Sequence, residues 1–270
     1  MTLDKNRSKV LIVRGKDPEK MVFKGLKQLG IKPTSKKVVI KPNLIIDKAP
    51  PVTTPVETVV ALARYFKENF DSEIIVAEGS GWCETFEAFR KLGYINFAKK
   101  GLFKLIDLNV DDYILIKNNK ALVLKEFKFP KTLRNSYLIS AAVMKTHSIT
   151  SVTLSLKNML GATVTERKGI AKKSVFHEYG IHSSIVDVVS YLKPSLAVID
   201  GRKACIGGEL GGRAVNYDLM IFSRDLVAAD AVASIILGYN PSSVTHLKLA
   251  SQVKLGYADL DKIEVIELET

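Results

Sequence analysis

The residues of this sequence that could carry chemistry stand in polar clusters directly after runs of apolar residues. Such clusters follow Ile40, Ala77, Met144 and Ile199. They combine lysines, which attract an anion, with glycine-rich turns, whose backbone N–H groups can bind its oxygens. A Glu or His in the same place can exchange a proton with the bound molecule. The clusters therefore predict a site for a small carboxylate or phosphate.

The candidate residues come from these clusters and from a later helical turn. The candidates for moving a proton are Glu78, Lys145 and His147. The candidates for binding substrate are Lys41, Asn43, Gly79, Ser80, Gly81, Lys157, Asn158 and Asp200. Residues 144–161 form the densest segment, because they hold four of these side chains between apolar anchors. Lys157 has an alternative role, in which it only binds the free carbonyls of its helix.

Histidines offer a second kind of site. The chain has four histidines, of which His147, His177 and His182 could supply imidazoles to a divalent metal. Glu78 or Asp200 would add a carboxylate. The spacing matches no compact metal motif, so the alternative is that these rings bond loop backbone or substrate. His246 falls in a helical stretch, where we expect a structural role.

Several common chemistries find no support in the sequence. The two cysteines, Cys83 and Cys205, are far apart, so this chain alone cannot ligate an iron–sulfur cluster or build a four-cysteine zinc site. Residues 207–212 are rich in glycine but do not lead from a strand into a helix, and Glu209 would repel a pyrophosphate. A phosphate-binding Walker loop and a G-x-S-x-G elbow are also absent from the sequence. The identity of any cofactor stays open.

The elements that must position these residues alternate between strand and helix. Strands are expected near residues 9–14, 37–40, 73–78, 103–107, 137–143, 195–200, 217–223 and 263–267, with helices between most of them. This order predicts an α/β fold with a mainly parallel sheet flanked by helices. Residues 113–117 and 121–124 are expected to form an antiparallel hairpin added to it, and Ser151 to cap a short helix that ends at Gly161. Asp17 is expected to cap the helix that Gly30 closes, and Thr54 the helix that runs to about Asn69. In such sheets a ligand binds beyond the carboxyl ends of the strands, where the polar clusters lie.

Length and charge limit the possible domain organisation, location and partners of the protein. The 270 residues fit one α/β domain, or two closely packed lobes of about residues 1–135 and 136–270. The sequence shows no signal-peptide pattern and no long apolar run, which predicts a cytoplasmic protein without membrane contact. Net charge is +12, and residues 1–50 hold 13 Lys or Arg against 4 Asp or Glu, a difference of +9. A basic face of this kind can attract an anionic substrate, an acidic protein or nucleic acid.

Several short motifs resemble the DUF362 family, a domain of unknown function whose members are often labelled iron–sulfur-centre proteins. The resemblance rests on residues 39–44, 53–55, 76–81, 143–147, 153–158, 182–187, 198–201 and 227–230. Many members carry an additional ferredoxin-like module, which this sequence lacks. The family is also distantly similar to the N-terminal half of the nickel-pincer lactate racemase group, which implies a Rossmann-like strand order.

Three functions follow from these observations, in order of preference. The first is an enzyme of unassigned reaction class that acts on a small anionic molecule at the strand ends. The second is a metal-associated redox component, or one that works with an iron–sulfur cluster on an acidic ferredoxin-like partner docked to the basic N-terminal region. The third is a nucleic-acid binder, which the lack of interleaved aromatic residues within residues 1–50 disfavours.

Overall fold

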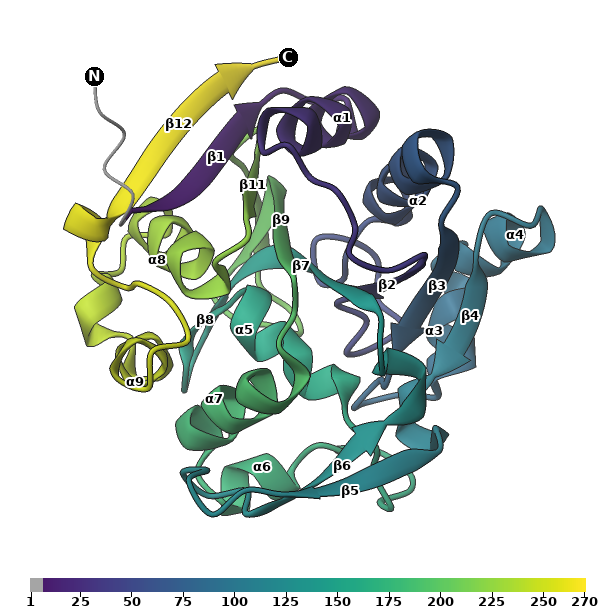
Figure 1. Cartoon of the computed structure of the whole chain (residues 1–270), viewed down its shortest axis with the longest axis vertical. Helices are drawn as coiled ribbons and strands as arrows, with labels where there is room; N and C mark the ends of the chain where they lie inside the picture. The colour runs from purple at the N-terminus through teal and green to yellow at the C-terminus, as the bar shows by residue number, and fades with distance from the viewer. Residues whose placement is uncertain (1–6) are drawn as a thin grey trace.

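A twisted sheet runs through the molecule and helices cover both of its faces (Figure 1). The computed structural model describes residues 7–270. In the described residues, the sheet has ten strands: β1 (Ser8–Arg14), β2 (Lys37–Pro42), β3 (Glu73–Glu78), β4 (Lys104–Asp107), β7 (Tyr137–His147), β8 (Ser151–Thr153), β9 (Leu196–Ile206), β10 (Arg213–Asn216), β11 (Leu219–Ser223) and β12 (Ile263–Glu269). The helices are α1 (Pro18–Gln28), α2 (Val56–Phe70), α3 (Thr85–Lys91), α4 (Tyr94–Lys99), α5 (Ser155–Asn158), α6 (Val175–Glu178), α7 (Ile181–Leu192), α8 (Leu226–Ile236) and α9 (Thr245–Gln252).

The strand order is β12-β1-β11-β9-β7-β2-β3-β4, with β10 beside β9 and β8 beside β7. Most neighbours along this path are parallel, and β11 is antiparallel to both of its neighbours. The expected α/β fold with a mainly parallel sheet is therefore confirmed. Strands from residues 1–135 and from residues 136–270 share this one sheet, since β1 lies between β11 and β12.

Side chains of the central strands alternate between two apolar cores, one on each face. In β2, Val38 and Ile40 pack with α1 and α2, whereas Val39 faces the core under α7 and α8. β9 follows the same rule, because Val198 faces the first core and Ile199 the second. Strands buried on both faces need apolar residues at every position, which explains the unbroken apolar runs in the sequence.

The antiparallel addition is a separate hairpin, but its second strand is not the expected one. β5 (Tyr113–Lys117) pairs with β6 (Glu126–Pro130), whereas residues 121–124 form the connection between them. The reason lies in helix α7, where the Asp187 carboxylate accepts hydrogen bonds from the backbone N–H groups of Leu122, Val123 and Leu124. These groups are therefore not free to pair in a sheet.

Two further expectations about local structure differ from what is observed. Thr54 does not cap α2, because its hydroxyl accepts from the Asn43 N–H at 2.8 Å and donates to the Ala141 carbonyl. Ser151 does not begin a helix, since β8 first pairs antiparallel with the end of β7 and α5 begins only at Ser155. In contrast, Asp17 caps α1 as the sequence predicts. Within residues 7–270, no helix combines the length and apolar character needed to cross a membrane.

Candidate active site

A small pocket opens beyond the carboxyl ends of the parallel strands, beside α5 and the loop before α6. Its volume is about 120 Å³, well below the few hundred Å³ of typical drug-sized sites. Eight residues proposed from the sequence line it: Lys41, Asn43, Glu78, Gly79, Gly81, Lys157, Asn158 and His177. The pocket therefore gathers residues from clusters more than 100 positions apart in the chain.

Lys41 and Glu78 form a buried ion pair on the pocket wall. The Lys41 Nζ lies 2.8 Å from the Glu78 carboxylate, and both side chains are almost fully buried. Glu78 also accepts hydrogen bonds from the backbone N–H groups of Leu44 and Gly79. Burial lowers the pKa of Lys41, while the charge of Glu78 and its hydrogen bond act in the opposite direction. The parallel pairing of β2 with β3 brings these two strand ends together.

Asn158 holds the Lys41 ammonium from the other side. Its Oδ1 accepts from Lys41 at 2.8 Å, and its amide nitrogen donates to the Lys41 carbonyl and to the Ser140 hydroxyl. All of these groups are buried. Asn158 is therefore fixed in orientation, and through it the end of α5 is joined to β2.

Lys145 lies behind the pocket rather than in its wall. Its Nζ donates to Asn43 Oδ1 at 3.0 Å and to the Val52 carbonyl at 2.9 Å. Burial lowers the pKa of Lys145 to about 8, against the attraction of Glu209. Because Asn43 lines the pocket, Lys145 reaches the site through this amide.

Glu209 joins His147 to Lys157. One carboxylate oxygen lies 3.0 Å from His147 Nε2, and the other accepts from Lys157 Nζ at 2.7 Å. The backbone N–H groups of Ile149 and Thr150 donate to His147 Nδ1, so in the neutral ring Nε2 carries the proton and donates it to Glu209. Burial raises the pKa of Glu209, but the His147 hydrogen bond and the lysine charges outweigh it and hold this pKa far below the ordinary value.

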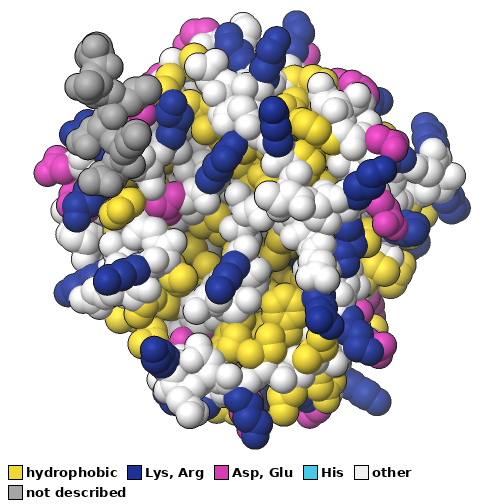
Figure 2. Space-filling model, in the orientation of Figure 1, with side chains coloured by type: hydrophobic (Ala, Val, Ile, Leu, Met, Phe, Trp, Pro, Cys, Tyr) yellow, Lys and Arg dark blue, Asp and Glu magenta, His cyan; other side chains and the backbone are white. Residues whose placement is uncertain are grey.

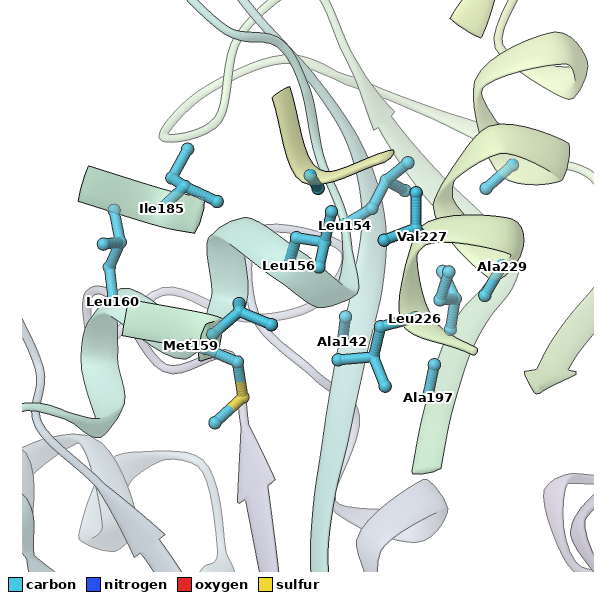
Figure 3. Close-up of a cluster of buried hydrophobic side chains, with 14 of the residues drawn as sticks. Ala142, Leu154, Leu156, Met159, Leu160, Ile185, Ala197, Leu226, Val227 and Ala229 are labelled. Atoms are coloured by element: carbon cyan, nitrogen blue, oxygen red, sulfur yellow. The ribbon is translucent and has the colours of Figure 1, made fainter. Parts of the chain in front are cut away.

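An apolar cluster fixes the segment that carries Lys157 and Asn158. Leu154, Leu156 and Met159 are buried against β7, α7 and α8 (Figure 3). The Asp230 carboxylate on α8 accepts from the backbone N–H groups of Ser155 and Leu156 at 2.8 and 2.9 Å. A helix as short as α5 is stable only through such contacts.

Two glycines leave space for this arrangement. A Cβ atom on Gly161 would lie 2.2 Å from Glu78 Oε1 and 2.6 Å from Lys41 Nζ. A Cβ on Gly79 would lie 2.8 Å from the Gly161 carbonyl oxygen and 3.2 Å from Lys173 Nζ. The ion pair and the pocket wall therefore require glycine at both positions.

Besides Lys145 and His147, three of the proposed residues do not line the pocket. The Ser80 hydroxyl donates to the Leu44 carbonyl and supports the turn from behind. Asp200 is buried against Arg202 and Thr58. His182 stacks on His246, with ring centroids 5.7 Å apart. Asp200 lies away from the rim because β9 continues beyond it to Ile206.

The proposed metal ligands are not gathered into a ligand set. Within residues 7–270, no group of three or more His, Cys, Asp or Glu side chains is arranged to hold a metal ion. His177 lines the pocket, whereas the His147 ring is bonded to Glu209 and His182 packs on α9. Three lysines also line the pocket, and their ammonium groups attract an anion rather than a cation.

Two charged residues of the pocket wall were not among the candidates from sequence. Glu209 lies in the glycine-rich segment that the sequence suggested would repel a phosphate, and Lys173 lies in the basic segment of residues 162–176. Lys173 Nζ donates to the Thr163 carbonyl and hydroxyl at 2.5 and 3.1 Å. The only signal for either residue was a charge within a loop, which does not indicate where the loop folds.

These elements define an α/β protein with a lysine-rich pocket at the carboxyl ends of its sheet. Residues 38–234 match the family model described as "Domain of unknown function (DUF362)", so the chain belongs to this family, as its motifs indicated. No curated protein matches the sequence.

A solved structure supports the fold. The lactate racemase apoprotein from Thermoanaerobacterium thermosaccharolyticum is similar to this chain with a TM-score of 0.53 and 12% sequence identity. The alignment covers 90% of this chain and 60% of the racemase chain, so this chain corresponds to only part of the racemase. At this identity the likeness concerns the arrangement of strands and helices alone.

Proposed function

We propose that this protein is an enzyme that binds a small carboxylate or phosphate ester in the pocket at the strand ends. The observation that carries the proposal is an excess of lysine over carboxylate. Lys41, Lys157 and Lys173 line the pocket, Lys145 lies directly behind it, and two carboxylates, Glu78 and Glu209, face these four lysines. Removing ammonium groups from water is unfavourable unless an anion compensates them. A bound anion would supply the missing negative charge.

The pocket's dimensions favour a ligand of a few heavy atoms. A volume of about 120 Å³ suits a short carboxylate or phosphate rather than a nucleotide. The lactate racemase that shares the fold acts, by its name, on a small carboxylate. A short carboxylate of this kind falls within the proposed substrate class.

Different residues would serve different parts of the reaction. Lys41 and Lys157 would bind the anion, with Asn43 and Asn158 fixing its orientation. Glu78 is the proton-exchanging candidate that lines the pocket directly. His147 would act through Glu209, and Lys145 through Asn43, because these are the neighbours that line the pocket.

Calorimetric titration with phosphate and with lactate at low salt tests the proposal. Lys157→Met should weaken binding roughly 10- to 100-fold, which corresponds to the loss of one charge-assisted hydrogen bond. The matched control is Lys128→Met, because Lys128 pairs with Glu166 on the surface and should leave binding unchanged. Absence of any saturable binding by the wild-type protein would remove the proposal.

Two alternatives were a redox component with an acidic partner and a nucleic-acid binder. No specific observation on the described residues favours either one. Figure 2 shows Lys and Arg side chains dispersed among apolar and acidic ones on the face drawn. A continuous basic stripe is what phosphate-backbone binding uses. We therefore rank both below small-anion binding.

A further inference from the structure

Lys173 differs from the other lysines of the pocket wall in its partners. Lys41 pairs with Glu78 and Lys157 pairs with Glu209, whereas in the described part of the chain Lys173 donates only to the Thr163 carbonyl and hydroxyl. It is partly rather than fully buried, and it lines the pocket. Its amine is thus held in place by two uncharged oxygens and remains accessible to a molecule in the pocket.

A buried group without a hydrogen-bond partner lies near Lys173. The Asn109 amide nitrogen donates to the Ser80 carbonyl and to the Thr85 hydroxyl, which fixes the orientation of the amide. Its Oδ1 is buried and has no hydrogen-bond partner among residues 7–270. This oxygen and Lys173 Nζ both lie close to Gly79, at 2.9 and 3.2 Å from the position that a Cβ there would take. The amine in the pocket wall and the buried free acceptor therefore both lie beside Gly79.

The protonation of Lys173 suits a reactive amine. Burial lowers the pKa of Lys173 to about 7, and the nearby positive charges of Lys41 and Lys172 add to this effect, against Glu78 and Asp107. Near neutral pH about half of the Lys173 side chains would carry a free lone pair, whereas for an ordinary lysine the fraction is below roughly one in a thousand. Desolvation of this kind is a common way to activate a lysine nucleophile.

We propose that Lys173 forms an imine with the carbonyl carbon of a 2-oxo acid or a similar small carbonyl-bearing anion. The inference rests on the proposed anion site, in which Lys41 and Lys157 hold the carboxylate. The Nζ lone pair attacks the carbonyl carbon, and one N–H proton passes to the carbonyl oxygen to give a carbinolamine. The second N–H proton then passes to the carbinolamine hydroxyl. The C–O bond then breaks, water leaves, and a C=N bond to Nζ remains.

Reductive trapping tests this inference directly. The full chain is incubated with glyoxylate or pyruvate at pH 7.5 and treated with sodium borohydride, which converts an imine into a stable amine. Intact mass and peptide mapping should then show one adduct per chain, at Lys173. The adduct should be lost in Lys173→Arg and retained in Lys168→Arg, the matched control, because Lys168 is an exposed lysine of the same segment.

The outcomes separate this inference from the proposed anion site. If pyruvate and lactate both bind by calorimetry but borohydride traps nothing at Lys173, the anion site stands and the imine is excluded. Adducts spread over surface lysines would also exclude it. If only phosphate binds, the anion site stands and the imine is excluded, and if neither acid nor phosphate binds, both proposals fail. Peptide mapping is done on the wild-type protein, so the result does not depend on whether Lys173→Arg folds.

Discussion

Lys157 and Glu209 are joined by a 2.7 Å ion pair between α5 and the glycine-rich segment after β9. The two residues are 52 positions apart, and both side chains are largely buried. The second oxygen of Glu209 is bonded to His147, so this one carboxylate joins three elements around the pocket. The negative charge of Glu209 also repels an incoming anion.

Glu209→Gln should change both stability and binding. Lys157 would lose its charged partner in a buried position, which should lower the free energy of unfolding by roughly 1–3 kcal/mol. Because one negative charge leaves the pocket, affinity for lactate should rise, by roughly tenfold if the charges interact as pairs near a protein surface do. Urea unfolding and calorimetry measure the two effects. Glu166→Gln is the control, since Glu166 lies on the surface, and an unchanged affinity in Glu209→Gln would contradict the argument.

Substitutions of Lys41 and Glu78 should have non-additive effects on the free energy of unfolding. Lys41→Met leaves the Glu78 carboxylate buried without its cation, which should cost about 3–5 kcal/mol in the free energy of unfolding. Adding Glu78→Gln removes the uncompensated charge and keeps an acceptor for the Leu44 N–H, so the double variant should recover part of this loss. Denaturant curves of the four proteins give the coupling energy. Simple additivity would show that the pair is not energetically coupled.

The sequence was most informative where a residue directly follows a buried strand. Lys41 and Glu78 were expected to meet because parallel neighbours end at the same edge of a sheet, and β2 and β3 are parallel neighbours. The same reasoning placed Asp200 at the rim. It could not show that β9 continues past this residue or that Arg202 and Thr58 would bind its carboxylate.

Residues in loops could not be placed from the sequence. Glu209 was interpreted as a charge that repels phosphate, and its position depends on the positive φ angles of Gly207 and Gly208, at 95° and 152°. These angles turn the chain back over β7, which no local pattern indicates. Lys173 was one of several lysines in a polar segment. Its place in the pocket wall depends on contacts with Thr163, ten residues earlier.

Gly161→Ala should disrupt the site by steric overlap. The added Cβ would lie 2.2 Å from Glu78 Oε1 and 2.6 Å from Lys41 Nζ, and neither group can move without breaking buried hydrogen bonds. We expect a loss of roughly 2–4 kcal/mol in the free energy of unfolding and weaker anion binding. Gly211→Ala is the matched control, because a Cβ there meets no atom within 4 Å. Equal stability of the two variants would contradict the proposed crowding.

His246 should contribute to loss of stability in acid. Its ring is fully buried, and neither ring nitrogen has a partner among residues 7–270. Burial, with the nearby charges of His182, Lys157 and His147, lowers the pKa of His246 to about 3. Between this pKa and the ordinary value of about 6.5, the unfolded chain binds a proton that the folded chain does not, so stability falls as pH decreases by up to about 1.4 kcal/mol per pH unit. Above that range the histidine has no such effect.

His246→Leu should therefore reduce the difference in stability between pH 7 and pH 5 by about 2 kcal/mol. Urea unfolding at both pH values measures this difference in the variant and the wild type. His177→Leu is the control, because its ring is exposed and a smaller change is expected. If His246→Leu keeps the full acid dependence, other groups cause it.

Anion binding should be accompanied by proton uptake above neutral pH. Burial lowers the pKa of Lys145 to about 8 and that of Lys173 to about 7, so at pH 8 both are partly or mostly unprotonated. A bound carboxylate favours the ammonium forms and raises both pKa values, so the complex takes up protons. At pH 6 both amines are already protonated, so no uptake is expected there.

Lactate suits this measurement, because its own carboxylate does not titrate near pH 8. Calorimetry in buffers of different ionisation enthalpy should give an uptake approaching one proton per ligand at pH 8 and close to none at pH 6. Lys173→Arg should reduce the uptake while leaving the lysine-rich pocket charged, since a guanidinium keeps its proton throughout this range. Lys168→Arg serves as the surface control. Binding heats at pH 8 that do not depend on the buffer would mean that the anion does not interact with these two amines.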